Sequence, residues 1–133
     1  MKILRYTFSF PKLTVKDGSL TEDGTVEETY TFTLLSKGIG LYEELSGKPL
    51  MATLISLDGD DAMEKMISKD FIANLACASY VKIEGDRFHN NRATAEEFKK
   101  TLAYAKATED VKFIRELVQM GMECINDTNQ KAI

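Results

Sequence analysis

The stretch LLSKGIGLYEELSGKP, residues 34–49, constrains the fold more than any other, because both ends of a short helix can be predicted within it. Ser36 can cap the start of this helix, since its hydroxyl can accept a hydrogen bond from the free amides of the first turn. Gly47 suits the left-handed residue that ends many helices, and Pro49 prevents further helical continuation. We therefore expect a fixed junction here, with strands before it and helices after it.

Two segments before this junction alternate like half-buried strands, residues 2–10 and 27–35. The apolar side chains on their shared face are Leu4, Tyr6, Phe8, Phe10, Tyr30, Phe32 and Leu34. Asp-Gly pairs at 17–18 and 23–24 signal turns in polar surroundings, with a brief extension of the first strand at Leu13 and Val15. We expect an antiparallel hairpin with a long polar tip at residues 16–25. Because an isolated hairpin is marginal in water, its aromatic face should pack on helices.

Helical spacing dominates the chain after the junction. Residues 49–57 favour a short helix, although a strand stays open as an alternative. The Asp-Gly-Asp sequence at 58–60 should break it, and Asp61 with Glu64 has the spacing of a capping box. The helix that follows is expected to continue to about Ile83, with a kink near residue 68. Small residues along it should allow another helix to approach closely: Ala73, Ala76, Cys77, Ala78 and Ser79.

Two further helices are predicted towards the C-terminus. Residues 84–92 form a polar loop, after which Thr94 and Glu97 have the spacing of a second capping box. Thr108 can cap the last helix. The sequence therefore predicts a single α+β domain over residues 1–133. Its parts are an N-terminal β-hairpin at 1–35 packed on about five helices at 36–127, followed by a polar tail at 128–133.

Two motifs resemble ligand sites only in part. Gly38-x-Gly40 at a helix start is similar to a dinucleotide-binding turn, but Glu43 holds the third glycine position and no βαβ unit follows. Close packing of the helix on the hairpin explains these glycines better. The acidic residues 58–61 have the composition of a calcium loop, but Met63 stands where such a loop needs glycine. We expect neither a cofactor nor a metal.

No assembled set of catalytic residues is evident in the sequence. His89 lies in a polar segment, and Cys77 and Cys124 fall in helical patterns without metal-ligand spacing. The protein is therefore expected not to be an enzyme. Its net charge of −4 argues against nucleic acid as the main partner. The alternating residues 1–10 do not resemble a signal peptide, and no apolar run is long enough to span a membrane, so we expect a soluble intracellular protein.

The last helix has more apolar positions than one face of a small domain needs. Methionine adapts to irregular partners and is favoured at promiscuous binding surfaces. The candidate partner-binding residues are Phe113, Leu117, Met120 and Met122. Burial of this helix on two sides would explain the same pattern, and both interpretations stay open at this point.

Two short patterns resemble those of the tail assembly chaperones of long-tailed bacteriophages, in particular phages of Gram-positive bacteria and related prophages. One lies in a helix that follows a strand, and its residues are Leu41, Glu43, Glu44, Gly47 and Lys48. The other opens a later helix, and its residues are Thr94, Glu96, Glu97 and Phe98. The resemblance covers residues 28–122, and its motifs are structural, not catalytic.

This resemblance implies a non-enzymatic protein that binds the tape measure protein and keeps it soluble in the host cytoplasm during tail assembly. It also implies self-association, absence from the mature virion, and contact with the tail tube protein through a longer, frameshifted form. The alternative is a structural tail completion or connector protein of the virion, which would use the hairpin for sheet augmentation.

Overall fold

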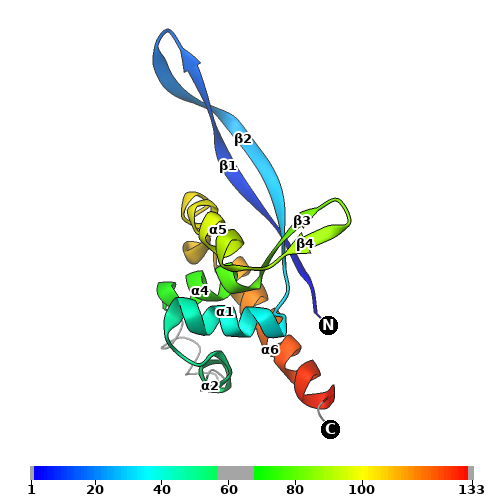
Figure 1. Cartoon of the computed structure of the whole chain (residues 1–133). Helices are drawn as coiled ribbons and strands as arrows, with labels where there is room; N and C mark the ends of the chain where they lie inside the picture. The colour runs from blue at the N-terminus through cyan, green and yellow to red at the C-terminus, as the bar shows by residue number, and fades with distance from the viewer. Residues whose placement is uncertain (1, 57–67, 132–133) are drawn as a thin grey trace.

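The most prominent element is a long N-terminal hairpin, the arm, in which β1 (Leu4–Lys16) pairs antiparallel with β2 (Ser19–Phe32). The structure is a computed structural model that describes residues 2–56 and 68–131, and the arm extends well beyond its helices (Figure 1). The turn is Asp17-Gly18, whose φ angles of 54° and 78° suit the tight turns that match strand twist. The predicted hairpin is confirmed.

The predicted polar tip at residues 16–25 is wrong, because strand pairing continues to Lys16 and Ser19. Pro11 pairs with Thr25 and Leu13 with Glu22, so Asp23 and Gly24 together stand opposite a single residue. Gly24 has a φ of 84°, which fits the glycine of a β-bulge. The second Asp-Gly pair therefore forms a bulge within a strand instead of a second turn.

The helices of the described residues are α1 (Ser36–Ser46), α2 (Leu50–Ser56), α4 (Lys69–Ser79), α5 (Arg92–Tyr104) and α6 (Val111–Lys131), with a 3₁₀ turn at Ala107–Glu109. Together with the arm they confirm the predicted α+β class. The segment after the junction is helix, α2, and the strand alternative is wrong. The predicted break at 58–60 and the box at Asp61 and Glu64 lie outside the described residues. The helical part was expected to end at residue 127, but α6 continues to Lys131.

The end of α1 is as predicted, and its start is not. Gly47 has a φ of 71°, and its N–H donates to the Glu43 carbonyl at 2.8 Å. Leu35 holds the N-cap position, and no side chain caps this end. Ser36 therefore lies inside the helix, so its hydroxyl is one residue too late to act as the cap.

Two other predicted caps are replaced by a neighbouring Asn or Asp. The Asn91 side chain accepts from the Thr94 N–H at 3.0 Å, and the Asn91 N–H donates to the Thr94 hydroxyl at 3.0 Å, forming a capping box. Thr94 therefore pairs backwards along the chain and not with Glu97. Asp110 accepts from the Phe113 N–H at 3.1 Å at the start of α6, while Thr108 lies in the 3₁₀ turn.

A second, short hairpin replaces the end of the predicted central helix and most of the predicted polar loop. α4 begins after Ser68, which accepts from the Phe71 N–H at 3.1 Å, and it ends at Ser79. β3 (Tyr80–Glu84) and β4 (Arg87–His89) follow, so the helix does not reach Ile83. β3 joins β2 through two residue pairs and gives a four-stranded sheet in the order β1-β2-β3-β4.

The side chain of Asn90 stabilises this change from helix to strand. Its Nδ2 donates to the carbonyls of Ala78 and Tyr80, at 2.9 and 2.8 Å. These carbonyls lie where α4 gives way to β3, and buried carbonyls need such partners. Tyr80 and Val81, an aromatic and a β-branched residue, then favour the extended chain.

Close packing of α1 on α4 confirms that small residues of α4 allow another helix to approach. A Cβ added at Gly38 would lie 2.8 Å from the Ala78 carbonyl oxygen, whereas one at Gly40 would meet nothing within 4 Å. Only one of the two glycines is thus required by packing. Gly38 packs against α4 and not against the hairpin, which corrects the predicted contact.

Candidate functional site

The four candidate residues of α6 belong to the hydrophobic core. Phe113, Leu117 and Met120 are completely buried, and Met122 is partly buried against the same core. The Phe113 ring lies 5.0 to 5.4 Å, between centroids, from the rings of Phe8, Tyr6 and Phe32 at the base of the arm. This corrects the predicted partner-binding surface and supports the other interpretation, in which α6 is buried on two sides.

Several exposed large apolar side chains of the described residues lie on the two hairpins, and one more, Val111, lies at the start of α6. Leu13, Val15 and Leu20, here called the tip row, are 53%, 70% and 71% exposed. Val15 stands directly opposite Leu20, and Leu13 stands opposite Glu22, so all four side chains share one face of the arm. Sequence reasoning missed the tip row because it assigned residues 16–25 to a loop. The alternation of Leu13 and Val15 before a two-residue Asp-Gly turn is the signal that could have located it.

The short hairpin carries a second exposed apolar pair. Ile83 and Phe88 are 57% and 60% exposed and are direct cross-strand partners. Figure 1 shows this hairpin projecting from the helices to one side of the arm. Exposed apolar residues scattered singly are ordinary on protein surfaces, whereas these two lie side by side and form a larger apolar surface.

A groove of about 460 Å³, the aromatic groove, lies between the base of the arm and α5. It is lined by Phe10, Val26, Glu28, Tyr30, Lys100, Thr101 and Tyr104. Tyr104 is half exposed, stacks on Phe10 with ring centroids 5.5 Å apart, and donates its hydroxyl hydrogen to the Pro11 carbonyl at 3.1 Å. The groove is therefore mainly apolar and has one side chain of each charge, Glu28 and Lys100.

Two tyrosines at the base of the arm are held neutral. Burial raises the pKa of Tyr30, whose hydroxyl also donates to Glu28 at 2.5 Å. Burial likewise raises the pKa of Tyr6, which donates to Asp110 at 2.7 Å. Asp110 also caps α6, so its carboxylate joins the start of that helix to β1. These phenols act as structural hydrogen-bond donors.

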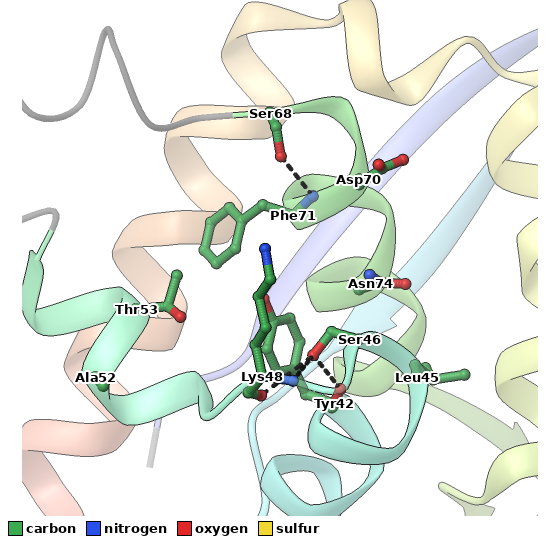
Figure 2. A pocket seen from close by; sticks show the side chains of 10 residues that line it. All are labelled: Tyr42, Leu45, Ser46, Lys48, Ala52, Thr53, Ser68, Asp70, Phe71 and Asn74. Atoms are coloured by element: carbon green, nitrogen blue, oxygen red, sulfur yellow. Dashed lines mark hydrogen bonds between the residues drawn. The ribbon is translucent and has the colours of Figure 1, made fainter.

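A second hollow, of about 510 Å³, lies between α1, α2 and α4, and Figure 2 shows its lining residues. The Ser46 hydroxyl donates to the Tyr42 carbonyl at 2.8 Å and accepts from the Lys48 N–H at 3.1 Å. The Ser68 oxygen accepts from the Phe71 amide. Both hydroxyls therefore serve helix ends.

Cys77 and His89, the other residues considered for chemistry, lie in different elements, α4 and β4. Burial raises the pKa of the Cys77 thiol to about 11, which makes it unreactive at neutral pH. His89 lies on the short hairpin with its Nε2 3.5 Å from a Glu84 carboxylate oxygen. Among the residues that the structure describes, no three His, Cys, Asp or Glu side chains lie close enough together to hold a metal ion.

The family pattern divides into core and surface positions. Leu41 and Phe98 are buried, and Gly47 ends α1. The acidic pattern residues are exposed, and Arg92 links two of the helices that carry them, since it lies 3.9 Å from Glu44 and 3.3 Å from Glu96. Both are exposed ion pairs, which contribute little to stability. These positions agree with the interpretation that the motifs are structural.

Within residues 2–56 and 68–131, no helix combines the length and the apolar character needed to cross a bilayer. Comparison with known proteins adds no relative: no protein-family model, no curated protein and no solved structure matches this chain.

Proposed function

We propose that this protein is a non-enzymatic tail assembly chaperone of a long-tailed bacteriophage, which binds the tape measure protein and keeps it soluble in the host cytoplasm. The observation that carries the proposal is the location of exposed apolar side chains on two hairpins that project from a helical body. Projecting strands with free edges and apolar rows are suited to gripping another polypeptide. The binding surface proposed is therefore the hairpins, not α6.

The positions of the family pattern support the same proposal. Leu41 and Gly47 build and end α1, and Phe98 joins α5 to the core, so the pattern maintains the body from which the arm projects. Phe98 lies against the arm, with ring centroids 5.4 Å from both Phe32 and Tyr30. A motif that fixes the base of the arm is consistent with a protein whose role is binding.

Co-expression with the tape measure protein from the same phage tests the proposal. We expect the tape measure protein to become soluble and to co-elute with this chain in size-exclusion chromatography. Replacing Ile83 and Phe88 by Ser should reduce the recovered complex, while the matched change of exposed Lys99 and Lys100 to Ser should not. A tape measure protein that stays insoluble, or that is equally soluble without this chain, would contradict the proposal.

A structural virion protein is the second candidate, and the free edge of the arm favours it. β2 pairs with β3 only through Thr31 and Phe32, so most of its outer edge has no strand partner in the described chain. Such an edge can take up a strand from a neighbouring virion protein. Mass spectrometry of purified virions separates the two roles, because a chaperone should be absent and a connector should be present in fixed copy number.

A further inference from the structure

The free edge of β2 is interrupted at both ends, which leaves an edge window at residues 25–29. β3 pairs with Thr31 on one side of the window, and the bulge at Asp23 and Gly24 disrupts the strand on the other. Within residues 2–56 and 68–131, no strand other than β1 pairs with the window. Five residues of strand span about 17 Å at the usual rise per residue, so the window is long enough for one short extended segment.

The backbone groups along the outer side of the window are exposed. The Thr33 N–H donates to the Ser79 carbonyl at 2.9 Å, so Thr33 and every second residue before it turn their backbone groups away from β1. Those within the window are Thr25, Glu27 and Thr29, which are all exposed. Each of them presents an N–H and a C=O with which an added strand can pair.

The opposite edge of the arm is closed at the same level. Pro11 stands opposite Thr25, and its backbone faces the outer edge of β1 by the same alternation. Proline has no N–H to donate there, and the Pro11 carbonyl already accepts a hydrogen bond from the Tyr104 hydroxyl at 3.1 Å. Strand addition at this level is therefore open to β2 and not to β1.

We propose that the edge window binds an extended segment of the client, the polypeptide that the chaperone keeps soluble, which adds to β2 as a short antiparallel strand. The inference rests on the proposed function for its partner and assigns the mode of binding. Side chains of the added strand next to Val26 and Glu28 would lie at the aromatic groove, because both residues line it. Those next to Glu27 would lie on the other face. Backbone bonds thus hold the segment, and the groove selects its alternate side chains.

The charges of β2 indicate the composition of this segment. β2 contains four acidic residues and no Lys or Arg. Glu27 stands opposite Ser9, and within the described residues no ion pair engages it, so it favours a basic side chain beside it. The groove contains Glu28 together with Lys100 and is otherwise mainly apolar, so it favours an apolar side chain. The segment that fits is therefore extended, with basic side chains on the outer face and apolar ones towards the groove.

An NMR titration of the full, isotope-labelled chain with a synthetic peptide tests this binding. The probe is a peptide of about seven residues with blocked ends, in which lysine and valine alternate. We expect its addition to shift the amide signals of residues 25–29 and to slow hydrogen exchange at Thr25, Glu27 and Thr29. A peptide with glutamate in place of lysine should bind at least about tenfold more weakly, because it places like charges beside Glu27.

Methylation of the peptide backbone separates strand addition from attraction between charges. The lysines stand next to Glu27 and its alternate neighbours, so their N–H groups are the ones that face β2 in an antiparallel pair. A methyl group on the backbone nitrogen of each lysine should therefore abolish the slow exchange of the window amides. The same methyl group on each valine should change the dissociation constant by no more than about twofold, since those N–H groups face away from β2.

A pair of proline variants tests the edge in the protein itself. Thr29→Pro removes one N–H from the window and should raise the dissociation constant of the lysine–valine peptide at least about tenfold. Thr7→Pro is the matched control, since Thr7 stands opposite Thr29, the two hydroxyl oxygens lie 2.7 Å apart, and the Thr7 N–H faces the other edge. The control should bind the peptide like the original chain. Circular dichroism should show both variants folded, because proline is tolerated where the N–H of a strand faces solvent.

The proposal would be overturned by no binding of the lysine–valine peptide to the original chain, by equal binding of the two methylated peptides, or by equal effects of the two prolines. Slow exchange of the window amides without peptide, at rising protein concentration, would also overturn it, because a second copy would then occupy the edge. If a proline variant fails to fold, the methylated peptides still decide the question on the original chain. None of these measurements contains the tape measure protein. Strand addition can therefore fail while the co-expression result stands, and the reverse.

Discussion

The last helix and the arm tip both differ from what their sequences indicate, in opposite directions. α6 has the wide apolar stripe and the methionines of a binding surface, yet Leu117 and Met120 are completely buried. The sequence of the tip predicts a polar loop, yet the side chains of Val15 and Leu20 there are 70% and 71% exposed. The difference lies in the number of neighbours: α6 is covered by the arm base and by other helices, whereas nothing in the described chain covers the tip. Apolar content alone therefore does not distinguish a buried core from an exposed surface.

Two phenylalanines should show the difference between α6 and an exposed hairpin most clearly. Phe113 packs among three aromatic rings at the base of the arm, so Phe113→Ala should lower the free energy of unfolding by about 3–5 kcal/mol. Phe88 is 60% exposed, and Phe88→Ala should cost less than about 1 kcal/mol. Urea denaturation followed by circular dichroism measures both. Equal losses of unfolding free energy for the two variants would mean that α6 is not part of the core.

A pair of leucines tests the same contrast between helix and arm tip. Leu117→Ala should lower the free energy of unfolding by about 2–5 kcal/mol, because Leu117 is fully buried. Leu20→Ala should change it by no more than about 0.5 kcal/mol, since that side chain is mostly in water. These values apply to the monomer, so the denaturation is done at low protein concentration. A larger loss for Leu20 would place the tip in a core.

The two glycines of α1 should respond in opposite ways to substitution by alanine. Gly38→Ala would force a Cβ to within 2.8 Å of the Ala78 carbonyl, and we expect a loss of about 1–3 kcal/mol from overpacking. Gly40→Ala meets nothing within 4 Å, so the higher helix propensity of alanine should stabilise the protein by up to about 1 kcal/mol. Thermal unfolding of the two variants should therefore shift in opposite directions. A shift in the same direction would contradict the packing of α1 on α4.

The smallest expected effect is the titration of Cys77 in the core. Its pKa is raised to about 11 by burial, above its ordinary value of 9.0, so the folded state holds the proton more tightly. The stabilisation is present below pH 9 and is lost as the pH rises towards 11. Between pH 8 and 10 the loss should be about 1 kcal/mol. Denaturant midpoints of the original chain and of Cys77→Ala at both pH values measure it, and an equal pH dependence would exclude Cys77 as the source.

Features with a strong local cause could be predicted from the sequence. Gly47 ends α1 because a left-handed residue favours glycine wherever it occurs. The alternating aromatics of the arm base predicted a hairpin that packs on helices, and the ring of Phe8 does lie against that of Phe113. At residues 23–24, in contrast, one local signal has two outcomes. A positive φ at Gly24 serves a bulge as well as a turn, and only the register with β1 decides between them.

Features that depend on distant contacts could not be predicted in this way. β3 is five residues long and is joined to β2 through Thr31 and Phe32, which are distant in the sequence. The stripe of α6 is compatible with a core or a surface until its neighbours are known. For the candidate site, the two short patterns that suggested the resemblance carried no information on the arm tip, since Leu13, Val15 and Leu20 lie outside them.

Hydrogen–deuterium exchange of the chain, alone and with the co-expressed tape measure protein, tests most directly whether binding resides in the hairpins. Backbone amides become protected where a partner covers or pairs with the chain. We predict added protection on binding in residues 13–26 and 80–90, with peptides from residues 113–125 protected equally in both samples. Added protection confined to residues 113–125, with the hairpins unchanged, would contradict the account.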